Sequence, residues 1–85
     1  MTDPDTTIKS LGQALRAMRR QQGLRLVDVA EIAGVSRLRV IHVEAGKPGV
    51  GIAAYARVAA AQGQQLSVTP ARRPTLEEIG ALLGE

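Results

Sequence analysis

The stretch AGVSRLRVIHVEAGKP, residues 33–48, decides the fold, because it combines a tight turn with a capped helix. Gly34 accepts the left-handed backbone of a sharp turn. Ser36 is a preferred residue at the N-terminus of a helix. Val40 and Val43 then recur at the spacing of a buried helical face, and Gly46 provides a stop. The stretch therefore predicts a short helix that follows a preceding element through a tight turn.

The other faces of this short helix carry the side chains that are free to contact a ligand. Arg37 and Arg39 stand at its start, and Leu38, Ile41 and His42 also lie away from the core face. A helix that begins with two arginines after a tight turn suits a negatively charged partner.

Working outward, apolar residues at helical spacing predict three more helices. The first runs from about Thr7 to Gln22, the next covers residues 26–33, and the last begins at Ile52 and runs out at Gly63. We therefore expect an all-α core. The acidic and polar residues 1–6 carry no such pattern, and we expect them to form a disordered N-terminal arm.

Length and composition limit the class of protein. A chain of 85 residues makes one domain, and Tyr55 is its only aromatic residue. It has no cysteine, its N-terminal residues do not resemble a signal peptide, and no apolar run approaches the roughly 20 residues of a membrane span. These features predict a cytoplasmic protein.

The charge is concentrated in the middle of the chain. Residues 9–47 carry eight arginines and lysines against three carboxylates, although the whole chain has a net charge of +3. A polyanion is the natural partner for such a segment, and an ordinary solvated surface is the alternative. His42 is the single histidine and the chain has no cysteine. We therefore expect no metal site, no cofactor and no enzymatic activity.

The run from Leu11 to Leu66 resembles the Xre (Cro/C1-type) helix-turn-helix family, and within it the HipB-like antitoxins. The segments that carry the resemblance are RRQQGL, VAEIAGVS, VEAGKP and ARVAAAQGQQL. The resemblance implies a four- to five-helix DNA-binding domain over residues 7–63 and a homodimer that represses transcription at a palindromic operator in double-stranded DNA.

It also implies an antitoxin that regulates its own operon and binds a cognate toxin. We favour a HipA-like kinase over an mRNA-cleaving enzyme. Two alternatives are a stand-alone Xre-type regulator and a protein-interaction module that no longer binds DNA.

The expected DNA contacts surround the helix that begins after Ser36. Arg37 either donates two hydrogen bonds to guanine or contacts a phosphate, and Leu38 either touches a thymine methyl or is simply an exposed apolar residue. His42 reaches a base or a phosphate. Ile41 is either a methyl contact or part of an interface. The resemblance implies phosphate contacts for two further residues, Arg39 and Lys47, and the alternative is that their charges only keep the protein soluble.

The chain departs from the family where the second helix begins. Relatives have a Ser or Thr cap followed by Gln, whereas this chain has Arg25 and Leu26. Loss of the cap costs about 1 kcal/mol, and we expect Arg25 to compensate by contacting a phosphate. The resemblance also implies an ion pair between Arg19 and Glu44 that joins the first and third helices.

Two elements are expected after the helices. In QQLSVTP, residues 64–70, Leu66 and Val68 alternate with polar residues, which predicts one short C-terminal β-strand that pairs across a dimer. An irregular tail is the alternative. Residues 71–85 contain a short helix whose apolar stripe either docks on the protein's own dimer or binds the toxin. The residues of that stripe are Leu76, Ile79, Leu82 and Leu83.

Overall fold

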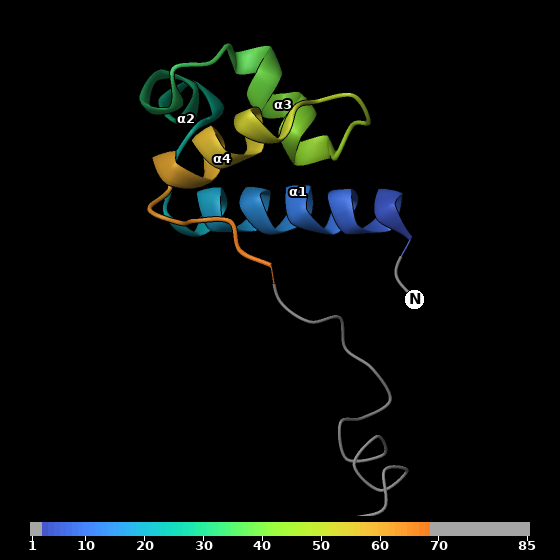
Figure 1. The fold of residues 1–85 in the computed structure, drawn as a ribbon. Coiled ribbons are helices and arrows are strands. Elements are labelled where there is room, and N and C mark those ends of the chain that lie inside the picture. Colours follow the sequence, from blue (N-terminus) through green and yellow to red (C-terminus); the bar gives the residue numbers. More distant parts are fainter. Residues whose placement is uncertain (1–2, 69–85) are drawn as a thin grey trace, which may run out of the picture.

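A computed structural model describes residues 3–68 of the chain. This part contains the helices α1 (Pro4–Gln21), α2 (Leu26–Ala33), α3 (Arg37–Ala45) and α4 (Ile52–Ala61). Figure 1 shows α2, α3 and α4 grouped on one side of the long helix α1. The four predicted helices are present, and α2 matches its predicted bounds.

Helix α1 begins three residues earlier than its apolar pattern predicted. Asp3 caps it, because the backbone N–H of Thr6 donates to the Asp3 carboxylate at 3.2 Å, and Pro4 occupies the first turn. Proline suits this place, since the first helical N–H groups have no partner within the helix. Residues 4–6, which we expected in a disordered arm, therefore form the first turn of α1.

The turn between α2 and α3 has the geometry expected from residues 34–36. Gly34 ends α2 with φ 71° and ψ 34°, in the left-handed region that favours glycine. The Ser36 hydroxyl accepts a hydrogen bond from the backbone N–H of Arg39 at 3.0 Å, which caps α3. These two local features set the direction in which α3 leaves α2.

The core is aliphatic and lies between the four helices. Its largest fully buried side chains are valines from three helices: Val29, Val40, Val43 and Val58. Leu15 of α1 and Tyr55 of α4 are each 3% exposed. The inward face of α3 is therefore fixed by packing, which leaves its opposite face outside.

Helices α1 and α3 also touch through their backbones. A Cβ atom at Gly12 would stand 2.5 Å from the carbonyl oxygen of Val43, and one at Gly46 would stand 2.6 Å from the Cα of Lys9. Only residues without a Cβ fit at such a separation. The C-terminal end of α3 is therefore held directly against α1.

Residues 64–68, where we expected part of a strand, are irregular in the described single chain. Leu66 is half-buried and packs against the protein's own core, whereas Val68 is 99% exposed. A strand forms through hydrogen bonds to a neighbouring strand, and the other residues of the range 3–68 form helices and their connections. Residues 69 and 70 and the expected short helix of residues 71–85 lie outside the described residues.

Candidate DNA interface

The outward face of α3 is formed by residues at helical spacing, Leu38, Ile41, His42 and Ala45. Leu38 is 59% exposed, Ala45 is exposed, and Ile41 and His42 are half-buried. Because the valines of α3 are buried on the opposite side, this face is the part of the helix that an incoming surface would meet.

An ion pair between Arg19 and Glu44 joins α1 to α3. Nε of Arg19 donates to Oε2 of Glu44 at 2.6 Å, and Nη2 of Arg19 donates to Oε1 of Glu44 at 3.1 Å. The same guanidinium donates through Nη1 to the carbonyl oxygen of Leu24 at 2.9 Å. The side chains of Arg19 and Glu44 are only 11% and 6% exposed. The pair therefore fixes α3 and the start of α2 relative to α1.

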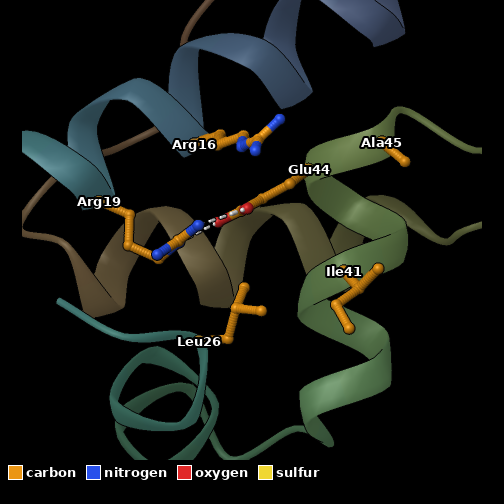
Figure 2. A pocket seen from close by; sticks show the side chains of 6 residues that line it. All are labelled: Arg16, Arg19, Leu26, Ile41, Glu44 and Ala45. Atoms are coloured by element: carbon orange, nitrogen blue, oxygen red, sulfur yellow. Dashed lines mark hydrogen bonds and ion pairs between the residues drawn. The ribbon is translucent and has the colours of Figure 1, made fainter.

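An open pocket of about 370 Å³ lies over this ion pair. Figure 2 shows Arg16 and Arg19 reaching into it from α1, with Leu26 of α2 and Ile41 of α3 at its other side. Ala45 completes the α3 side of the pocket. The outward face of α3 thus continues into a hollow that has an apolar side and arginines along α1.

A second open pocket, of about 560 Å³, shares several of these residues and has a strongly basic lining. We call it the arginine groove. Its arginines come from α1, from the residue before α2 and from the first residue of α3; they are Arg16, Arg19, Arg20, Arg25 and Arg37. The N-termini of α2 and α3 both reach the groove, and helix N-termini favour anions.

Three arginines of the groove keep their charge available. Arg19 pairs with Glu44 and Arg25 pairs with Asp28, whereas none of the ion pairs in residues 3–68 engages Arg16, Arg20 or Arg37. Sequence reasoning did not single out Arg16 and Arg20. Their spacing of four residues on a predicted helix is the signal that would have placed both on one face.

The start of α2 is stabilised in a way that the sequence reasoning missed. The backbone N–H of Arg25 donates to Oδ2 of Asp28 at 2.8 Å, so Asp28 provides the acidic half of a capping box. The Arg25 guanidinium also donates to both carboxylate oxygens, from Nε at 3.1 Å and from Nη2 at 2.9 Å. The expected loss of capping is thus partly offset by Asp28, and Arg25 is engaged by Asp28 in the described structure.

This contact changes the titration of both groups. The hydrogen bond from the Arg25 side chain, followed by the one from its backbone N–H, lowers the pKa of Asp28 below its ordinary value of 3.8. The same side-chain hydrogen bond, followed by attraction to the carboxylate, raises the pKa of Arg25. Both groups therefore stay charged at neutral pH.

The remaining predicted contacts lie around α3 but outside the two pockets. Arg39 and Lys47 are exposed near opposite ends of the helix. Ser36 acts through its capping hydrogen bond and is also exposed. Of the predicted contacts, Arg25 and Arg37 lie together in the arginine groove. Arg16 and Arg20 of α1, which were not predicted as contacts, line the same groove.

A comparison with protein families gives a match to the family described as helix-turn-helix domain, over residues 10–76. The chain belongs to this family. In this helix-turn-helix domain, α2 and α3 are the two helices joined by the tight turn, and α3 is the second of them. No curated protein and no solved structure gives a significant match to the chain.

Two further properties of residues 3–68 bear on the site. None of their helices has the length and apolar character needed to cross a membrane. Among the same residues, no cluster of three histidine, cysteine, aspartate or glutamate side chains is placed to hold a metal ion.

Proposed function

We propose that this helix-turn-helix protein is a DNA-binding transcriptional repressor that places α3 in the major groove of double-stranded DNA. The arginine groove carries the proposal. It lies beside the start of α3. When a recognition helix enters the DNA major groove with its N-terminal residues near the bases, the phosphate backbone passes beside this end of the helix. The protein acts in this proposal by binding and not as an enzyme.

Roles follow for the individual residues. Arg16, Arg20 and Arg37 face the backbone as unpaired positive charges, and the outward face of α3 meets the base edges. Arg37 also reaches guanine, because a guanidinium can donate two hydrogen bonds to O6 and N7. Arg39 and Lys47, exposed on either side, bind further phosphates.

The test starts with selection of binding sites from random duplex DNA, followed by measurement of affinity against salt concentration. The Arg20→Ala and Lys47→Ala variants are expected to weaken binding to all sequences alike and to lower the salt slope by about one each. Arg37→Ala is expected to weaken binding by about 1–3 kcal/mol, or roughly 5- to 150-fold, and to relax preference at one base pair.

Arg57→Ala is the matched control, because Arg57 is exposed on α4 and lines neither pocket. It removes the same charge and is expected to leave the affinity nearly unchanged. Salt-independent binding, or an equal loss in the Arg57 variant, would contradict the proposal. A sequence-blind loss in Arg37→Ala would reduce Arg37 to a phosphate contact.

The proposed active form is a homodimer. Two recognition helices about one DNA turn apart need a two-fold axis, and that axis suits a palindromic operator. The exposure of Val68 supports pairing through residues 64–70, because a second copy would cover this side chain. Val68→Pro removes a strand N–H and is expected to lower dimerisation in sedimentation, whereas Val68→Thr keeps the N–H. Equal dimerisation of both variants and the parent would mean that another surface holds the copies together.

We further propose that the protein is the antitoxin of a toxin–antitoxin pair. A HipA-like kinase is the toxin that we favour. The support is the resemblance to HipB-like antitoxins and the apolar stripe of residues 71–85. Truncation after Pro70 is expected to leave DNA binding intact and to abolish capture of the protein encoded by a co-transcribed gene. A truncated chain that still binds that protein would contradict this role for the stripe.

A further inference from the structure

The outward face of α3 carries few hydrogen-bonding side chains. Leu38, Ile41 and Ala45 are three of its four members, and His42 is the remaining one. Leucine, isoleucine and alanine side chains have no donor or acceptor for a base edge. Leu38 nevertheless exposes 59% of its surface. It lies near the N-terminal end of α3, and this is the end of a recognition helix that contacts the base edges in the DNA major groove.

Positive charge surrounds this apolar strip. Ile41 and Ala45 line the same pocket as Arg16, which none of the ion pairs in residues 3–68 engages, and Leu26 adds a further aliphatic group there (Figure 2). Arg19 also lines this pocket, but Glu44 pairs with it there. Arg37 stands next to Leu38 and lines the arginine groove. The partner must therefore present apolar groups flanked by negative charges.

The major groove of an A·T-containing duplex has this combination. The C5-methyl group of thymine is the apolar group that base pairs offer there, and phosphates run along both edges of the groove. A protein with an apolar face would match the strip alone and would leave Arg16, Arg20 and Arg37 without anions. Charge complementarity thus favours DNA as the occupant of this face.

Building on the DNA-binding role proposed above, we propose that α3 reads thymine methyl groups through Leu38 and Ile41, while Arg16, Arg20 and Arg37 hold the flanking phosphates. This assigns the base class of the operator: A·T pairs with their thymine methyls opposite Leu38 and Ile41. Arg37 supplies the neighbouring polar contact.

Deoxyuridine tests this directly, because it differs from thymidine only by the missing methyl group. In a selected binding site, each thymine is replaced in turn by uracil, and the affinity of the full-length chain is measured for each duplex. Loss of a buried methyl group corresponds to about 0.8 kcal/mol, which is a weakening of about fourfold for each contacted thymine. We expect such losses at a small number of positions in each half-site and none at the others.

The Leu38→Ala variant tests whether Leu38 is the residue that contacts the thymine methyl group. In this variant the parent duplex is expected to bind more weakly, and uracil at the position opposite Leu38 should cause no further loss. Ile32→Ala is the matched control, since Ile32 is 63% exposed on α2 and lines neither pocket. It should retain the full response to uracil.

The outcomes separate this inference from the DNA-binding role. Sequence-selective, salt-dependent binding that ignores every uracil substitution would overturn methyl reading and leave the repressor proposal standing. If uracil at the position opposite Leu38 lowers the affinity equally for Leu38→Ala and for the parent, methyl reading by Leu38 is also overturned. The methyl group would then affect the affinity through DNA shape and not through Leu38. A change in the sedimentation of the free protein on Leu38→Ala would instead make this face an interface between copies. Absence of binding to any duplex would overturn both proposals.

Discussion

The Glu44→Ala substitution tests how α3 is held, because Glu44 connects α3 to α1. The carboxylate accepts two hydrogen bonds from Arg19, at 2.6 and 3.1 Å, and the two side chains are 11% and 6% exposed. Removing the carboxylate leaves a guanidinium that is nearly cut off from water and retains only the Leu24 carbonyl as acceptor. Breaking one side of a buried pair typically costs about 3–5 kcal/mol.

For a domain of this size, each kcal/mol lowers the melting temperature by about 4–8 °C. We therefore expect Glu44→Ala to melt at least about 12 °C below the parent in circular dichroism, with a matching fall in the urea midpoint. A loss of this size takes a large part of the roughly 5–15 kcal/mol that holds a domain folded.

Two variants make the test specific. Glu31→Ala removes the same side chain from an exposed position of α2 that forms no ion pair in the described structure, and should change the melting temperature little. The double variant Arg19→Met with Glu44→Leu removes both charges and refills the space, so it should recover most of the lost stability. The reasoning is refuted if Glu44→Ala melts like Glu31→Ala.

Three other predictions follow from local contacts. Gly12→Ala should destabilise the fold by about 1–3 kcal/mol, because the new Cβ meets the backbone of α3 at 2.5 Å. At an unobstructed helical position, replacing glycine with alanine would instead stabilise the protein. A raised melting temperature would therefore contradict the close contact. Burial raises the pKa of Tyr55 above its ordinary value of 10.0, so the unfolded chain loses this proton first and stability should fall as pH rises above 10. As Tyr55 is the only aromatic residue, phenolate absorbance should appear together with unfolding, and ionisation at the ordinary pH in a fully folded chain would disprove this. The lowered pKa of Asp28 stabilises the fold above pH 3.8, and this contribution is lost as pH falls through the lower folded value. Carboxyl NMR should show the Asp28 pKa moving back toward 3.8 in Arg25→Ala, and an unchanged titration would refute the side-chain hydrogen bond as its main cause.

Local features of the chain were sufficient to predict the helices and the turn. Val40 and Val43 identified the buried face of α3, and Gly34 and Ser36 identified the turn and the cap. Hydrogen bonds within a helix and its caps connect residues no more than about four positions apart. The capping role of Asp28 has the same short range, because Asp28 stands three places after the cap residue Arg25; from the sequence we considered only the missing Ser or Thr at the cap and did not predict this role.

The arginine groove depended on tertiary structure. Arg16 and Arg20 belong to α1 and Arg37 belongs to α3, so they line one pocket only after the helices pack. The Arg19–Glu44 contact, which spans 25 positions, was expected from family resemblance and not from any local pattern. Periodicity indicates which face of a helix is buried, but not which distant residues stand beside that face. That depends on how closely and at what angle helices approach, and here the backbone contact at Gly12 sets how closely α1 and α3 approach each other.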